Sequence, residues 1–348
     1  MNVLYIFGNG LDIAQGMKTS YREFYEYLFK ESVGLSPVMN QLLNHIKSDI
    51  KLWSDMEEAL GAFTSKLDSQ QVFEDLYFEI NKQLRSYLTK QDSRYKPSSQ
   101  NQRRFCHDLL HFDEYLGETD RNRFTSFINN DIPKSYYSKV YEEYIDEKPL
   151  ITRNVITFNY THTLEKLIVD EPDRIWYHDV DINQIIHVHG SLSDTIVFGV
   201  DNESQISNNS FKENDDIKDI LVKNQSNLSL KLQRSTNCEQ FIKEANVIVL
   251  FGVSLGETDS RWWKLIGEQL KTRRDICIVQ FVYSPLREGQ ESKLLEGRIE
   301  RNQKEKLMKR MDLDNKEDVA ERLFFIVNSD AFKRIRHGLF DNILGHTY

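Results

Sequence analysis

Three polar side chains that could do chemistry stand shortly after apolar runs of the chain. They are Asp12, Asn159 and His189. An imidazole that is neutral near pH 7 can accept a proton, and a carboxamide can orient a hydroxyl group or a water. A carboxylate can accept a hydrogen bond or stabilise a developing cation. These residue types can bind a ligand and move a proton where the fold brings them together.

Two glycine turns accompany these side chains. Gly8-Asn9-Gly10 follows the apolar residues 3–7, and Gly252-Val253-Ser254-Leu255 follows residues 247–251. Glycine adopts positive φ and admits groups that approach closely, so we expect the backbone amides of the first turn to face a ligand. A glycine pair alone is weak support, because many strand-to-helix turns need glycine for geometry only.

Each candidate also has a purely structural alternative. Asn159 can satisfy backbone groups at a strand-to-helix turn. His187 and His189 share one strand face, where a packed core histidine is common. Ser254-x-x-Glu257 fits a capping box, as Ser20-x-x-Glu23 does, so Ser254 can simply begin a helix. The individual residues leave these alternatives open, and only their gathering at one sheet edge favours a site.

The elements that must position these residues belong to an α/β fold. Short β-rich runs alternate with helical patterns after residue 150, which predicts a mostly parallel sheet covered on both faces. Residues 20–149 instead show apolar residues at helical spacing. We therefore predict a Rossmann-like core of residues 1–19 and 150–348 with a helical insertion or cap of residues 20–149. The expected strands are residues 3–7, 153–158, 184–188, 195–200, 246–251, 275–282 and 322–327.

The composition narrows the class of protein. With 348 residues the chain can bury one large core or two domains without disulfides or metals. Cys106, Cys238 and Cys277 are scattered and match no zinc or disulfide pattern, which predicts a reducing cytoplasm. We expect no signal peptide and no membrane-spanning segment. A net charge of −9 argues against nucleic acid as a partner.

Five motifs in order resemble the bacteriophage abortive infection AbiH family over nearly the whole chain. They are FGNGLDIAQGMKTSYREFYEYL from Phe7, WSDMEEAL from Trp53, ITFNYTHTLE from Ile156, HVHGSL from His187 and VLFGVSLGETDSRWW from Val249. Five motifs in the same order are far more specific than one glycine turn. The resemblance implies a protein of anti-phage defence, for which a phage-derived trigger is a partner to expect.

The same motifs are similar to a remote sirtuin-like NAD-binding core. The resemblance implies that NAD or a related nucleotide is bound, with no metal. Thr161 departs from the aspartate of sirtuins and the four-cysteine zinc module is missing, which puts protein deacylation in doubt and favours NAD hydrolysis. The implied contacts are Gly8, Asn9 and Gly10 at the diphosphate, Thr157, Phe158 and Asn159 at the nicotinamide ribose, His189 as catalytic histidine followed by Gly190 and Ser191, and Gly252, Ser254 and Leu255 beside the adenosine.

Cleavage of the nicotinamide glycosidic bond passes through a cationic ribose, which assigns a hypothetical role to each candidate. Asn159 would orient the water or a ribose hydroxyl, and His189 would accept a proton. Asp12 would accept a hydrogen bond from the ribose or stabilise the cation. The helical insertion would cap the pocket or sense the trigger.

Two other functions stay open at this stage. One is a metal-dependent nuclease or phosphohydrolase. The other is a non-enzymatic nucleotide-binding sensor of phage. The sequence does not fix the oligomeric state, and a homo-oligomer is among the options. The residues that could supply a divalent metal site are His107, His111, His162, His178, His187, His189, Asp12 and Asp259.

Overall fold

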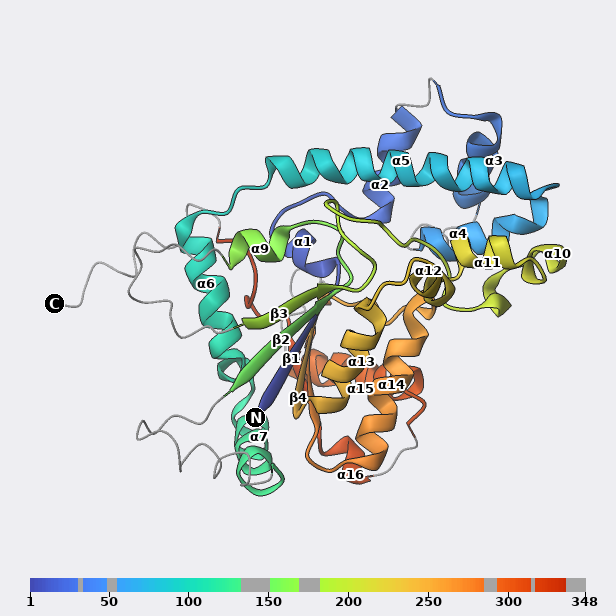
Figure 1. The fold of residues 1–348 in the computed structure, drawn as a ribbon. Helices are drawn as coiled ribbons and strands as arrows, with labels where there is room; N and C mark the ends of the chain where they lie inside the picture. The colour runs from blue at the N-terminus through green and yellow to red at the C-terminus, as the bar shows by residue number, and fades with distance from the viewer. Residues whose placement is uncertain are drawn as a thin grey trace.

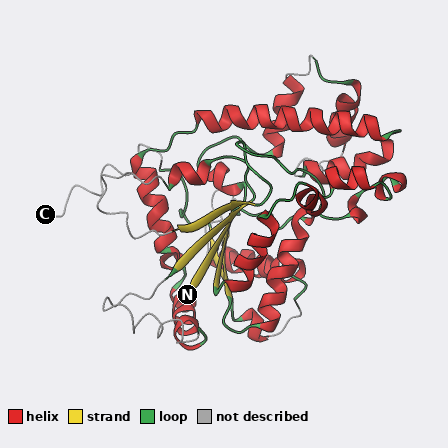
Figure 2. Cartoon of the chain, in the orientation of Figure 1, coloured by secondary structure: helices red, strands yellow, loops and turns green. Residues whose placement is uncertain are grey.

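A six-stranded sheet lies at the centre of the computed structural model, which describes residues 1–30, 34–48, 55–132, 151–168, 182–284, 293–313 and 317–335. Each pair of neighbouring strands runs parallel (Figure 2). The order across the sheet is β3-β2-β1-β4-β5-β6. The strands are β1 (Asn2–Phe7), β2 (Thr152–Thr157), β3 (Ile182–His187), β4 (Val247–Phe251), β5 (Cys277–Val282) and β6 (Leu323–Val327).

This strand order confirms the predicted α/β class with a Rossmann-like parallel sheet. The order 3-2-1-4-5-6 is that of the Rossmann fold, in which the winding reverses between β1 and β4. Phe7 is in register with Thr157 on one side and with Phe251 on the other. The carboxyl ends of these strands therefore meet at one edge, where open α/β sheets bind their ligands.

Helices cover both faces of the sheet because its strands are apolar on both sides. Tyr5 and Phe7 pack with α6 and α7, whereas Leu4 and Ile6 pack with α13, α14 and α15. Figure 1 shows these two groups on opposite sides of the strands. The helices near the sheet are α6 (Ser99–Leu110), η3 (Phe112–Tyr115), α7 (Glu118–Asn130), α9 (Thr163–Leu167), α13 (Arg234–Glu244), α14 (Ser260–Thr272), α15 (Lys293–Arg310) and α16 (Glu317–Ala320).

A third core lies beyond the carboxyl edge of the sheet (Figure 1). Leu76, Ile80 and Leu84 of α5 pack there among other helices and against residues 196–222. We refer to the helices of this core as the helical module. They are α2 (Tyr21–Lys30), α3 (Pro37–Ser48), α4 (Met56–Phe63), η2 (Thr64–Lys66), α5 (Gln70–Arg94), η4 (Glu203–Gln205), α10 (Asn209–Lys212), α11 (Asp215–Leu221) and α12 (Lys223–Ser229).

The predicted helical insertion contributes to two cores. Its α2 to α5 belong to the helical module, whereas α6 and α7 cover the sheet. The predicted capping box at the start of α2 is present, because the Glu23 amide donates to the Ser20 hydroxyl and the Ser20 amide donates to the Glu23 carboxylate. The boundaries at residues 20 and 149 stay a prediction, and Trp53 of the WSDMEEAL motif lies outside the described residues.

The strand predicted over residues 195–200 is wrong. This segment is a loop that enters the helical module, with Ile196, Phe198 and Val200 buried in the module's core. Its one ladder contact is an isolated bridge between Val200 and Val222. The segment is apolar because it is buried against helices, and a short apolar run does not distinguish that environment from a sheet.

Candidate functional site

A cavity of about 710 Å³ opens at the carboxyl edge of the sheet, at the switch point between β1 and β4. Strand ends form its floor, and Tyr21, Leu84 and Leu88 of the helical module form part of its wall. Most of the residues predicted for the site therefore share one cavity. Those that line it are Gly8, Asn9, Gly10, Asp12, Phe158, Asn159, His189, Gly252 and Ser254.

The glycines let the β1 and β4 turns touch. A Cβ added to Gly10 would lie 2.3 Å from the Cα of Gly252, which itself has a φ of +68°. The amides of Gly8 and Gly10 donate to the carbonyls of Phe251 and Gly252. The expectation that these amides face a ligand is therefore wrong for Gly8 and Gly10, because both amides already donate hydrogen bonds to carbonyls at the end of β4.

Asn9 is hydrogen-bonded to the loop that follows α1 (Gly10–Ala14). Its amide nitrogen donates to the Thr19 carbonyl over 3.0 Å, and the Thr19 hydroxyl donates to its amide oxygen over 2.6 Å. Both residues line the cavity. The side chain of Asn9 thus shapes the wall between the glycine turn and α2, and its contact with a nucleotide stays a prediction.

Asp12 holds Asn159 in one orientation. The Asn159 amide nitrogen donates to Oδ1 of Asp12 over 3.1 Å, and the Thr161 hydroxyl donates to Oδ2 over 2.7 Å. Because the nitrogen is used in this way, Oδ1 is the free end of the Asn159 amide. This oxygen is buried and has no hydrogen-bond partner among the described residues. The pKa of Asp12 is raised by burial, which the surrounding hydroxyl and amide donors only partly offset.

His189 presents a second free acceptor. Its Nε2 contacts Oδ1 of Asp259 at 2.8 Å, while its buried Nδ1 has no hydrogen-bond partner among the described residues. Burial and the charge of Lys223 lower the pKa of His189, so the ring is neutral at pH 7. A carboxylate can only accept, so Nε2 carries the ring proton and Nδ1 holds a lone pair. This arrangement suits a general base.

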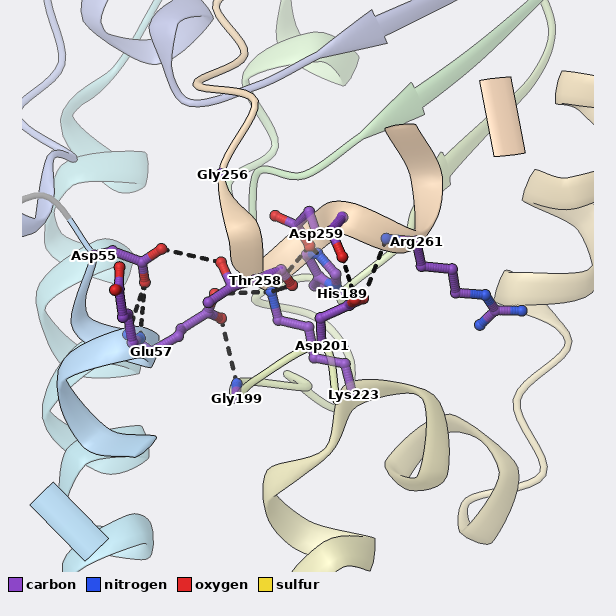
Figure 3. A network of polar contacts seen from close by, with 12 residues as sticks. Asp55, Glu57, His189, Gly199, Asp201, Lys223, Gly256, Thr258, Asp259 and Arg261 are labelled. Carbon is purple, nitrogen blue, oxygen red and sulfur yellow. Dashed lines mark hydrogen bonds and ion pairs between the residues drawn. The ribbon is translucent and has the colours of Figure 1, made fainter. Parts of the chain in front are cut away.

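Behind His189 lies a network of charges that the sequence analysis missed (Figure 3). The buried Lys223 ammonium donates to Asp259 over 3.0 Å and to Glu57 over 2.7 Å. Lys223 and His189 hold the pKa of Asp259 far below its usual range despite burial, and burial raises the pKa of Glu57 to about 8 against the pull of Lys223. Glu57 and Asp259 both lie in the motifs WSDMEEAL and VLFGVSLGETDSRWW quoted above, which was the available signal. Nothing in the sequence pattern singled out Lys223.

Four predicted contact residues lie behind the cavity wall. The Thr157 hydroxyl accepts a hydrogen bond from the backbone N–H of Asn159 over 3.1 Å, and so positions Asn159. Gly190 has a φ of +80° and closes the turn that contains His189, because its backbone amide donates to the His187 carbonyl, and Ser191 follows it. Leu255 is buried in the core beside α14. These residues shape the site from behind, and a direct nucleotide contact for them stays a prediction.

Ser254 does not begin a helix as its capping-box pattern suggested. The short helix η5 (Glu257–Asp259) has Gly256 as its N-cap residue, without a side-chain cap. Ser254 instead lines the cavity, and its carbonyl accepts a hydrogen bond from Lys306 over 3.0 Å. The structural alternative for Ser254 is therefore wrong.

The histidines of the metal hypothesis have other partners. His187 contacts the Asn159 carbonyl with Nδ1 and Glu165 with Nε2, at 2.7 Å and 2.6 Å. His107 and His111 stack with ring centroids 4.7 Å apart. Within the described ranges no group of three or more His, Cys, Asp or Glu residues could hold a metal ion. His178 lies outside those ranges.

The fold and the cavity define a Rossmann-like α/β protein with a cavity at the switch point of its sheet. A family model described as bacteriophage abortive infection AbiH matches residues 4–281, a span that includes every residue lining the cavity. The chain therefore belongs to the AbiH family, a family of abortive infection proteins that defend against bacteriophage, as its motifs predicted. No curated protein matches it. No helix in the described part of the chain is long and apolar enough to cross a bilayer.

Proposed function

We propose that the protein hydrolyses NAD at the bond between nicotinamide and ribose. One observation carries the proposal: His189 and Asn159, whose Nδ1 and Oδ1 are buried acceptors without partners among the described residues, both line a single cavity at the switch point of a Rossmann sheet. Sheets of this order bind dinucleotides at that point. The volume of about 710 Å³ falls within the roughly 300 to 1,000 Å³ typical of ligand pockets.

His189 is the proposed general base. In the reaction the bond from C1′ to the pyridinium nitrogen breaks, and its electron pair leaves with nicotinamide, which becomes neutral. A water forms the new bond to C1′ and releases one proton, so the products are ADP-ribose, nicotinamide and a proton. Nδ1 of His189 receives that proton, and Asp259 stabilises the imidazolium through Nε2. A base of this kind contributes about 10² to 10⁴ in rate.

Asn159 is proposed to orient the ribose or the water. Its free Oδ1 can accept a hydrogen bond only from a donor, and the ribose hydroxyls and the attacking water are both donors. Asp12 accepts a hydrogen bond from the nitrogen of the same amide, and that contact makes Asp12 a positioning residue. The predicted direct contact of Asp12 with the ribose remains part of the proposal, since each carboxylate oxygen can accept a second hydrogen bond.

Release of nicotinamide from NAD by the purified protein tests the proposal. The assay is run with and without extract from phage-infected cells, because an abortive infection protein is expected to need a trigger. We expect His189→Ala to lower the rate about 10² to 10⁴-fold, and Asn159→Ala to lower it by a smaller factor. His111→Ala is the matched control, since His111 lies outside the cavity and pairs with Glu114.

Two results would contradict the proposal. Equal rates in the wild type and in both variants would remove His189 and Asn159 from the chemistry. Tight binding of NAD without release of nicotinamide, even in the presence of the extract, would favour the sensor. That a phage component triggers the protein and that the chain self-assembles both stay predictions, and the comparison of wild type with the variants does not depend on either.

A further inference from the structure

Three separate segments of the chain meet at the ammonium group of Lys223. Glu57 comes from α4, Thr258 and Asp259 come from η5, and Lys223 itself begins α12. The ammonium donates to Glu57 over 2.7 Å, to the Thr258 carbonyl over 2.9 Å and to Asp259 over 3.0 Å. Each of the three N–H groups of the Lys223 ammonium thus has one acceptor. Figure 3 shows these side chains converging.

Lys223 and His189 contact the same atom. Oδ1 of Asp259 lies 3.0 Å from the Lys223 ammonium and 2.8 Å from Nε2 of His189. A cation that shares an oxygen with an imidazole holds that oxygen in place. It also disfavours a second positive charge on the ring. Lys223 therefore acts on both the position and the charge of His189 without lining the cavity.

We propose that Lys223, anchored by Glu57 of the helical module, is a positioning residue that keeps His189 in its base form through Asp259. This inference rests on the proposed function, which it extends by making the helical module a part of the catalytic site. The backbone fixes Lys223 as well, because its amide donates to the Val200 carbonyl over 3.0 Å. The base is then fully assembled only while α4, α12 and η5 are packed together.

The charges around His189 set the expected direction of each change. Asp259 faces the ring from η5, Lys223 from α12 and Asp201 from the loop before η4, while Glu57 of α4 stands behind Lys223. Removing the cation of Lys223 leaves Asp259 as the nearest charge to the ring, so a proton on His189 becomes more favourable. Replacing Glu57 by glutamine keeps an acceptor for Lys223 and leaves its cation in place, so a proton on the ring becomes no more favourable.

Titration of His189 by NMR, on protein with labelled histidine rings, tests the inference without reference to activity. The spectrum of His189→Ala identifies the resonance among the nine histidines. We expect Lys223→Met to move the titration of His189 to higher pH, and Glu57→Gln to leave it unchanged or move it lower. In the nicotinamide assay, Lys223→Met should be about tenfold slower than wild type at pH 6, and the gap should close above pH 8.

Two further variants complete the test. Lys218→Met removes a lysine of α11 that is ion-paired with Asp215 and Glu203, and it should change neither titration nor rate. Lys223→Met combined with Glu57→Gln removes the cation together with the buried carboxyl group beside it. It keeps the test valid if the single variant fails to fold, and His189 should again titrate at higher pH.

The inference is overturned if His189 titrates as in wild type in a folded Lys223 variant, or if Lys218→Met has the same effect. Failure of the proposed function is a different result, because the wild type then releases no nicotinamide while the titration of His189 still responds to Lys223.

Discussion

Two polar side chains that line the cavity, Asn159 and His189, are held in place by different kinds of interaction. Each carries one buried acceptor without a partner among the described residues, Oδ1 of Asn159 and Nδ1 of His189, and we call the residues that hold them the Asn159 wall and the His189 wall. The hydrogen bond that Asn159 donates to Asp12 positions Asn159, whereas Asp259 and the ion pair it forms with Lys223 position His189. An unpaired buried polar atom costs about 1 to 3 kcal/mol, and in the proposed function the ribose or the attacking water supplies the missing partners.

The comparison separates a wall built by hydrogen bonds from one built by charges. Hydrogen bonds fix the orientation of a side chain, and the Asn159 wall needs only that. An ion pair also changes how readily its neighbour takes up a proton, which a base requires. Loss of charge should therefore affect the His189 wall more than the Asn159 wall, and the following predictions test that difference.

Asp259→Asn is expected to have the largest effect. An asparagine can donate to Nε2, which places the ring proton on Nδ1 and removes the base. We expect the rate of nicotinamide release to fall about 10² to 10⁴-fold while NAD binding, measured by calorimetry, stays within a few fold. Asp330→Asn is the control, because Asp330 is exposed and pairs with Lys333. A rate near wild type for Asp259→Asn would show that Nδ1 is not the acceptor.

Asp12→Asn should have a smaller effect on the rate, about tenfold, because asparagine keeps hydrogen bonds to Asn159 and Thr161. A loss as large as that of Asp259→Asn would show that the Asp12 charge acts on the substrate directly and would break the comparison between the walls.

Asp12→Asn also makes a prediction about stability. Burial raises the pKa of Asp12, so the folded protein binds this proton more tightly than the unfolded chain. The carboxyl therefore lowers stability as the pH rises from its unfolded value of 3.8 through the folded value. Thermal unfolding should show a higher midpoint for the variant at pH 8, with the gain reduced near pH 4.

The difference between the walls also explains what the sequence could predict. Asp12 and Asn159 are 147 residues apart, but each follows a strand, and parallel strands bring their carboxyl ends to one edge by rule. His189 follows a strand too, and the motifs that identified it were short and recognisable. The parallel sheet and the gathering of Asp12, Asn159 and His189 at its carboxyl edge could thus be predicted before any contact was known.

The positions of Glu57 and Lys223 behind His189 do not follow from the arrangement of parallel strands. Glu57 and Lys223 are 166 residues apart, in helices whose packing against each other depends on side-chain shape. A buried lysine gives no pattern in sequence, because nearly all lysines lie at the surface and the surrounding residues of α12 are polar. The same limit explains the loop over residues 195–200, whose apolar residues contact helices rather than strands.

The smallest effect is expected where a charge supports the Asn159 wall. His187 contacts the Asn159 carbonyl and Glu165. Burial opposes a proton on the His187 ring, but the contact with Glu165 outweighs it and raises the pKa. The pair thus adds full stability below the unfolded His pKa of 6.5, provided Glu165 is ionised, and loses it as the pH rises through the folded value.

Glu165→Gln tests this pair. The free energy of unfolding should differ from wild type by less than about 1 kcal/mol, because the Glu165 side chain is 40% exposed and solvent screens the pair. Urea titrations should show the difference at pH 5.5 and its loss by pH 9, and Glu305→Gln, at an exposed site on α15, should show none. A difference that persists at pH 9 would mean that the pair acts by packing. Asn159 would then be positioned by hydrogen bonds and packing alone, whereas His189 depends on the ion pair of Asp259 with Lys223.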